Sequence, residues 1–217
     1  MCFSATASFV ASGVLAATGV VALSQVRKKR DLMLALIPLI FALQQLIEGV
    51  LWMNVGTGNL WEAFSKQGFL FFALFWWPAF VPWVCFAIER EKFRRKIMVW
   101  LFVIGVIIGT FLYVRALTLP ANVEILNACL NYKLELFWPY VFSGGYLLVV
   151  FASFIASSEK LLRVFGVTLM ISAVLAWGVF RSVFISVWCF FSAVLSVIIC
   201  VYLIKKKKKY GFIKTKV

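Results

Sequence analysis

The 217-residue sequence contains no histidine, and it has only 8 acidic residues against 22 lysines and arginines. Without histidine, this chain has no Ser-His or Cys-His catalytic pair, no HExxH zinc-protease motif and no haem held by a histidine of its own. Its five cysteines form no CxxC pair, which excludes a zinc knuckle and a thioredoxin-like motif. The commonest general base and metal ligand are therefore missing from the sequence.

Charged residues are also scarce. They make up 14% of the chain, while 64% is hydrophobic, and the mean hydropathy is +1.01. A soluble domain is about 45–50% apolar and about a quarter charged, so a water-soluble globule is excluded. A net charge of +14 would suggest nucleic acid binding in a soluble protein. Here the basic residues are expected to flank membrane spans, so the expected partner is a lipid bilayer and not nucleic acid.

Long apolar runs fill most of the chain. A helix needs about 20 mostly apolar residues to cross a hydrocarbon core of about 30 Å. The runs are apolar all round and show no period-2 pattern, which favours helices over a β-barrel. The sequence therefore predicts an all-α polytopic membrane protein: a single seven-transmembrane-helix domain over residues 1–204, followed by a basic tail over 205–217. The predicted spans are 3–26, 32–53, 68–88, 97–117, 136–156, 161–180 and 183–204.

The basic residues fall unevenly between the two ends of these spans. One face receives 18 of the 22, after the first, third and fifth spans and in the tail, whereas the other receives Lys66, Arg115, Lys133 and Arg181. The positive-inside rule then predicts an outside N-terminus and a cytoplasmic C-terminus. The lysine run at 205–209 either fixes this topology or also binds anionic lipid at the cytoplasmic face, at about 1 kcal/mol per charge.

The second span carries a polar face. Gln44, Gln45, Glu48 and Trp52 lie on one side of a helix, with Glu48 about 8 Å from its outer end at about 1.5 Å per residue. At that depth a carboxylate is paired, hydrated or protonated. Ionisable groups inside spans mark functional sites by default, although a glutamate can also tie helices together through hydrogen bonds. Both interpretations stay open.

The first and last spans carry stripes of small residues that typically pack helices together. In the first span, Ser4, Ser8 and Ser12 recur every fourth residue, and Ser8 lies at the depth of Glu48. In the last span, Ser186 and Cys189 belong to a similar stripe, next to Trp188. Together, the three spans are expected to surround an outward-facing polar pocket. Arg115 and Arg181, at the outer ends of their spans, are its candidate countercharges.

Cysteine offers a second chemistry. Removal of Met1 would leave Cys2 with a free amine beside its thiol, a pair able to bind a soft metal or to act as a nucleophile. The alternative is an inert small hydrophobe. Cys2, Glu48 and Cys189 are the candidate metal ligands, and a disulfide among Cys2, Cys129 and Cys189 on the oxidising outer side is an open possibility.

Four segments carry a family resemblance: MCFSATASF at the start, QQLIEGVLW in the second span, FFALFWWPAFVP in the third and SVWCFFSAVLS in the last. Together they resemble a family of bacterial multi-pass membrane proteins, a domain of unknown function, whose members begin Met-Cys-Phe-Ser. The resemblance implies no activity. It implies a family pattern made of the residues Cys2, Ser4, Ser8, Gln44, Gln45, Glu48, Trp52, Trp188 and Cys189.

Three classes of function follow. Binding or transport of a small polar ligand or ion around Glu48 accounts best for the polar residues at one depth. A membrane-embedded enzyme or metal-binding protein using Cys2, Glu48 and Cys189 is the second. The third is a seven-helix sensor, although the last span has no lysine that would hold retinal.

Overall fold

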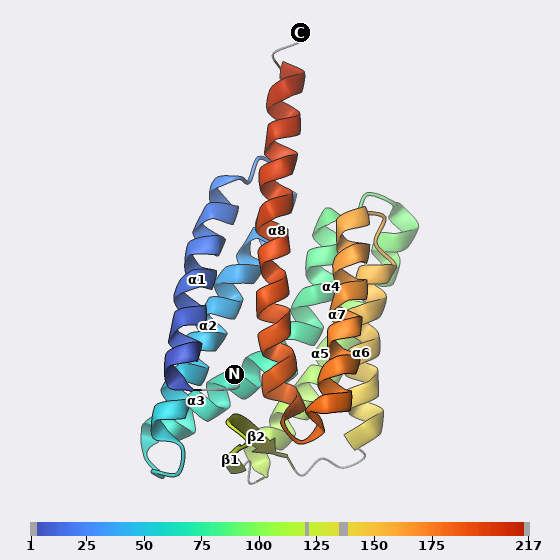
Figure 1. Cartoon of the computed structure of the whole chain (residues 1–217). Helices are drawn as coiled ribbons and strands as arrows, with labels where there is room; N and C mark the ends of the chain where they lie inside the picture. Colours follow the sequence, from blue (N-terminus) through green and yellow to red (C-terminus); the bar gives the residue numbers. More distant parts are fainter. Residues whose placement is uncertain (1–3, 120–121, 135–138, 215–217) are drawn as a thin grey trace.

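The computed structural model describes residues 4–119, 122–134 and 139–214, with side chains described to 134 and again from 143 to 206. Helices run side by side along one axis, and a short hairpin lies across one end (Figure 1). The elements in order are α1 (Ala5–Ser24), η1 (Lys29–Asp31), α2 (Leu32–Asn54), α3 (Leu60–Leu70), η2 (Phe71–Trp76), α4 (Trp77–Ile88), α5 (Lys92–Thr118), β1 (Asn122–Leu126), β2 (Cys129–Lys133), α6 (Pro139–Ile155), α7 (Lys160–Val179), η3 (Arg181–Val183) and α8 (Phe184–Lys214).

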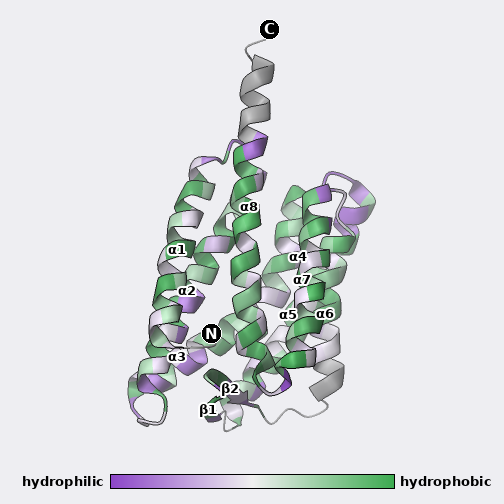
Figure 2. Cartoon of the chain, viewed as in Figure 1, coloured by the Kyte–Doolittle hydropathy of each residue, from purple (hydrophilic) through white to green (hydrophobic). Residues whose placement is uncertain are grey.

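Within the described residues, six helical segments are long and apolar enough to cross a membrane: Ala5–Ser24, Lys29–Asn54, Leu60–Ile88, Lys92–Thr118, Lys160–Val179 and Arg181–Lys206. A shorter apolar helix, Ser143–Ile155, lies where a seventh span is expected. Figure 2 shows hydrophobic residues along the bodies of the helices and hydrophilic ones gathered at the connections. The protein is an integral membrane protein of the all-α class.

Three expectations about element bounds were wrong. Segment 54–67 is not only a loop: α3 begins at Leu60, where the Asn59 side chain accepts the backbone N–H of Glu62 at 2.8 Å. The preceding turn uses Gly56 and Gly58 at φ +81° and +66°, values that favour glycine. The helix of the last span also continues well into the tail, since α8 ends at Lys214.

The third correction concerns segment 118–135, which contains a β-hairpin. Strands β1 and β2 pair antiparallel, with Leu126 opposite Cys129. Asn127 and Ala128 form the two-residue turn at φ 51° and 56°, a type of turn usually marked in sequences by Asn-Gly. Alanine in the second position hid this signal. Four consecutive β2 residues, from Cys129 to Tyr132, are buried against η3 and α8.

Helix α8 lies between the α1–α2 pair and α7, and α4 packs on α5 and α6. The third predicted span is interrupted by η2, a π-helical segment just before Pro78, where proline cannot continue α-helical hydrogen bonding. Pro82 likewise leaves the carbonyl of Pro78 without its helical donor. Gly105 of α5 packs directly on that carbonyl.

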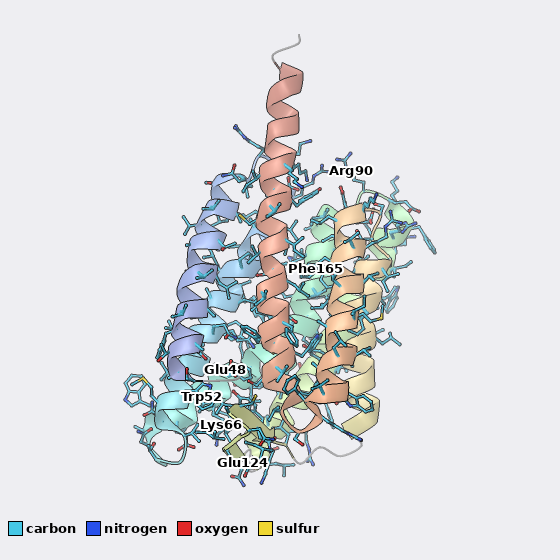
Figure 3. The ribbon with its side chains drawn as sticks, in the orientation of Figure 1. Glu48, Trp52, Lys66, Arg90, Glu124 and Phe165 are labelled. Atoms are coloured by element: carbon cyan, nitrogen blue, oxygen red, sulfur yellow. The ribbon has the colours of Figure 1, made fainter. Side chains whose placement is uncertain are left out.

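The connections that carry basic clusters lie at one end of the molecule. The α1–α2, α4–α5 and α6–α7 connections share this end with the last turns of α8 (Figure 1). Arg90 lies at this end, whereas Lys66 and Glu124 lie at the opposite end, near Glu48 and Trp52 (Figure 3). The structure thus places at one end the connections whose basic residues the sequence analysis assigned to a single face.

Candidate functional site

Glu48 of α2 is fully buried where this helix contacts α8. Its Oε1 accepts a hydrogen bond from the Ser186 hydroxyl at 2.7 Å, and its Oε2 accepts one from the Gln45 amide at 3.4 Å. The shared face of α2 therefore brings Gln45 and Glu48 together as expected. The partner from another helix is Ser186, 138 residues away in the chain.

Gln44 extends the cluster to α4. Its Oε1 accepts a hydrogen bond from the indole Nε1 of Trp77 at 2.8 Å, and the Trp77 ring stacks on Phe41 with centroids 4.0 Å apart. Both Gln44 and Gln45 are fully buried. The hydrogen bond and the stacked ring together hold Gln44 in place. Sequence analysis did not identify Trp77 as part of the site, because a tryptophan in an aromatic-rich span carries no distinguishing signal.

Several buried polar atoms around Glu48 have no hydrogen-bond partner among the described residues. They are Ser8 Oγ, Gln44 Nε2, Gln45 Oε1 and Tyr132 Oη. A buried polar group left without a partner costs about 1–3 kcal/mol. If these polar atoms served only to pack the helices together, they would be hydrogen-bonded to one another. Helix packing alone therefore does not explain so many unpartnered atoms in one region.

Tyr132 of β2 is a second member of the cluster, after Trp77, that sequence analysis missed. It is 7% exposed, and burial, reinforced by the nearby Glu48 carboxylate, raises the pKa of its phenol well above the usual range. Its hydroxyl therefore lies close to the Glu48 carboxylate. The hairpin was not expected, so nothing in the sequence placed Tyr132 beside α2.

The remaining predicted site residues have mixed positions. Ser4 caps α1, accepting the N–H of Ala7 at 3.2 Å, and Trp52 is half-buried near the end of α2. Ser8 is buried, but it is not hydrogen-bonded to Glu48. Its neighbour one turn on, Ser12, donates to the carbonyl of Ala42 at 2.8 Å, as expected for a packing stripe.

Neither candidate countercharge pairs with Glu48 in the described part of the chain. The Arg181 guanidinium lies over the Trp177 ring, 4.9 Å from its centroid, and the Arg115 Nε is buried with no hydrogen-bond partner among the described residues. Neither arginine forms an ion pair within the described part of the chain. Counting depth along helices gives the height of a side chain but not the direction in which it points.

The metal hypothesis has no support within the described residues, which contain no group of three His, Cys, Asp or Glu side chains placed to hold an ion. Cys189 is a free, buried thiol beside the cluster, as Cys85 and Cys200 are elsewhere. Cys129 is disulfide-bonded. Cys2, the third proposed ligand, lies outside the described residues.

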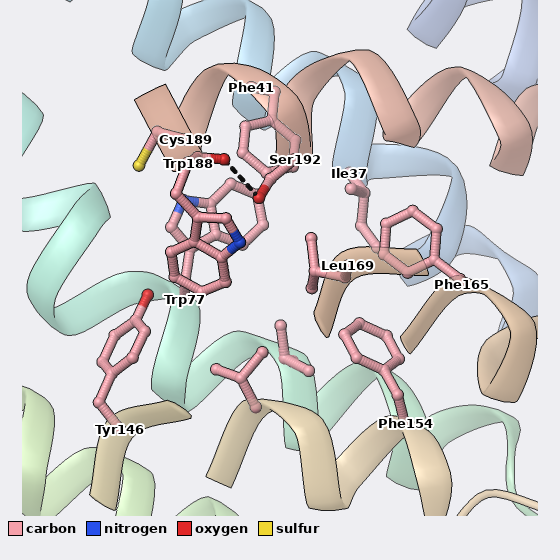
Figure 4. A pocket seen from close by; sticks show the side chains of 12 residues that line it. Ile37, Phe41, Trp77, Tyr146, Phe154, Phe165, Leu169, Trp188, Cys189 and Ser192 are labelled. Atoms are coloured by element: carbon pink, nitrogen blue, oxygen red, sulfur yellow. Dashed lines mark hydrogen bonds between the residues drawn. The ribbon is translucent and has the colours of Figure 1, made fainter. Parts of the chain in front are cut away.

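Two cavities adjoin the cluster. A small one of about 30 Å³ is almost wholly apolar, and it is bounded by Phe41, Trp77 and Trp188 among others (Figure 4). A much larger one of about 770 Å³ lies among α5, α6, α7, α8 and β2. Tyr132 and Cys189 line the larger cavity and separate it from Glu48.

These features define the class: an integral membrane protein whose helices enclose a carboxylate among unpartnered polar groups. The chain belongs to the family of unknown function DUF6629, whose model matches residues 1–212. Comparison with curated proteins found no match, and neither did comparison with solved structures.

Proposed function

We propose that this protein binds, or carries across the membrane, a small polar ligand or ion at the Glu48 cluster. The observation that supports this is the set of unpartnered buried atoms on Ser8, Gln44, Gln45 and Tyr132 beside a fully buried carboxylate. A ligand that both donates and accepts hydrogen bonds would satisfy these atoms. Glu48 itself favours a cation or a ligand with a donor group.

We further propose that the protein is a seven-span protein of the bacterial inner membrane, with the Glu48 end outside. The grouping of basic clusters at the opposite end supports this orientation, and those clusters would face the anionic lipids of the cytoplasmic leaflet. The disulfide at Cys129 supports it independently, since disulfides persist in oxidising compartments. The ligand would then enter from outside the cell.

The test is Glu48→Gln, which keeps shape and hydrogen bonding but removes the charge. Thermal unfolding of the purified protein in detergent is followed against a panel of monovalent and divalent cations, amino acids and amines. A ligand present at about 100 times its Kd stabilises the folded state by about 2.7 kcal/mol. We expect at least one compound to stabilise the wild type in this way and to leave Glu48→Gln unaffected.

Glu124→Gln is the matched control, because Glu124 is an exposed carboxylate at the same end, paired with Lys133 at 2.7 Å. It should respond to the compound as the wild type does. Two results would contradict the proposal: Glu48→Gln responds as strongly as the wild type, or it fails to fold, which would assign Glu48 a structural role.

A further inference from the structure

The 770 Å³ cavity is separate from the Glu48 cluster and has a different chemistry. Its volume falls within the roughly 300–1,000 Å³ of sites that hold small molecules. Its walls are mostly apolar and aromatic, formed by residues such as Leu112, Leu147, Phe151 and Met170. Such walls suit a hydrocarbon chain better than a polar solute.

The cavity lies in the half of the molecule near Glu48. On α7 it is lined by Met170, Ala173, Val174 and Trp177, and on α6 by residues between 143 and 151, which are in the parts of both helices nearer the hairpin end. Val174 and Trp177 of this lining are 65% and 53% exposed. The cavity therefore opens onto an apolar outer surface of the bundle, where acyl chains of the surrounding leaflet would lie.

One end of the cavity is polar and positively charged. Arg181 and Ser182 are exposed there, and Arg181 has no carboxylate partner among the described residues. A guanidinium binds phosphate oxygens through charge-assisted hydrogen bonds, often two at once. The apolar walls and the cation at the mouth together match an amphiphile with an anionic head.

A second observation points to an absent ligand. Trp188 lines the cavity and is 7% exposed, stacked on Phe184 with ring centroids 5.6 Å apart, yet its indole Nε1 has no hydrogen-bond partner within the described chain. Indole nitrogen is only a donor, so its missing partner is an acceptor. The ester oxygens of a glycerolipid are acceptors located between the head and the chains.

We propose that this cavity binds one phospholipid of the surrounding leaflet, with an acyl chain between α6 and α7, an ester oxygen at Trp188 and the phosphate at Arg181. The inference goes beyond the function proposed for Glu48 and does not depend on it. Glu48→Gln should retain the lipid, so failure of one proposal leaves the other intact.

The test compares two neighbouring exposed residues of α7. Val174→Trp places a large side chain at the mouth of the cavity, whereas Leu175→Trp, at a residue 58% exposed and outside the lining, is its matched control. Each protein is purified in detergent and incubated with equal amounts of a phosphatidylglycerol and a diacylglycerol of the same chains. After gel filtration, bound lipid is measured by mass spectrometry.

We expect the wild type and Leu175→Trp to retain about one phosphatidylglycerol per chain, and Val174→Trp to retain several-fold less. Arg181→Gln should bind lipid but lose about tenfold of its preference for phosphatidylglycerol over diacylglycerol, the size expected for a charged hydrogen bond. Lys66→Gln, at another basic residue of the same end, should keep the preference. Equal retention by Val174→Trp and the wild type would overturn the proposal, as would an unchanged preference in Arg181→Gln.

Discussion

Glu89 is a second buried carboxylate, and it lies at the basic end of the molecule. Both of its oxygens accept hydrogen bonds. It is 3% exposed and accepts the backbone N–H groups of Arg90, Glu91 and Ser158 at 2.8, 3.1 and 2.7 Å. Burial alone would raise the pKa of Glu89, but the hydroxyl and N–H of Ser158 and the N–H groups of Glu91 and Arg90 outweigh it and lower the pKa to about 2. Glu89 thus joins the α4–α5 and α6–α7 connections.

This depressed pKa has a consequence for stability. The stabilisation from ionised Glu89 is present above the ordinary pKa of 4.5 and is lost as the pH falls toward about 2. We expect Glu89→Gln to lower the free energy of unfolding at pH 7 by about 1–3 kcal/mol and to show a smaller loss of Tm than the wild type between pH 5 and pH 3. Thermal unfolding in detergent measures both.

Glu91→Gln is the control, because Glu91 pairs with Arg94 at an exposed position. Exposed pairs contribute about 0–1 kcal/mol, so its pH profile should follow the wild type. A Glu89→Gln profile that runs parallel to the wild type would show that Glu89 does not carry the pH dependence.

At the same scale, the sequence predicted which residues of α2 cluster. Helical periodicity placed Gln44, Gln45 and Glu48 on one face, and the cost of a charge in a span marked Glu48. Periodicity within one helix says nothing about which side chain a neighbouring helix presents. The sequence placed Ser186 on a stripe near the expected pocket but could not pair it with Glu48, and Trp77 and Tyr132 emerged only with the packing.

At the scale of elements, the close approach of α4 and α5 depends on a missing side chain. Gly105 of α5 lies against the Pro78 carbonyl and the side chain of Val149, so an added methyl group meets backbone. Small residues allow such approaches between membrane helices. The pairing also covers a carbonyl whose helical donor is removed by Pro82, as membrane-embedded backbone requires.

We expect Gly105→Ala to destabilise the protein by about 1–3 kcal/mol, the usual cost of overpacking, despite the better helix propensity of alanine. Gly178→Ala in α7 is the matched control, since a methyl group there meets nothing within 4 Å. It should be neutral or stabilising. Equal Tm values for Gly105→Ala and the wild type would show that the two helices separate at no cost.

The elements themselves were predictable to different degrees. Apolar length located the helices, because the cost of burying polar groups in lipid acts on every residue of a span. The hairpin was missed because it lies outside this constraint, and the start of α3 was missed because Glu62 and Lys66 interrupt its apolar run. They are fixed instead by local features: the turn at Asn127 and Ala128, and the cap at Asn59.

At the scale of the whole molecule, the charge distribution predicts how the protein sits in its membrane. Lys206 of α8 pairs with the buried Asp31 at 2.8 Å. This ion pair joins two segments far apart in the sequence and helps to hold the basic end of the bundle together. The hairpin end has a disulfide instead. Only the disulfide depends on its compartment, since disulfides persist in oxidising surroundings.

The orientation is tested by reporter fusions. A green fluorescent protein fused after Val217 should fluoresce, and alkaline phosphatase fused there should be inactive, because both outcomes require a cytoplasmic C-terminus. Alkaline phosphatase inserted in the turn near Gly58 should be active. Activity of the phosphatase at Val217 would reverse the proposed orientation.

The π-helical turn at Phe71–Trp76 has an implication for the descent of this chain. Such a turn holds one residue more than the α-helix it interrupts, so inserting or deleting a single codon is enough to create or remove it. Deleting one residue there would restore an unbroken helix. It would also rotate α3 about the helix axis by about 100° relative to Trp77. Relatives with and without the insertion would therefore share a sequence pattern in α4 yet present different faces of α3 to the hairpin.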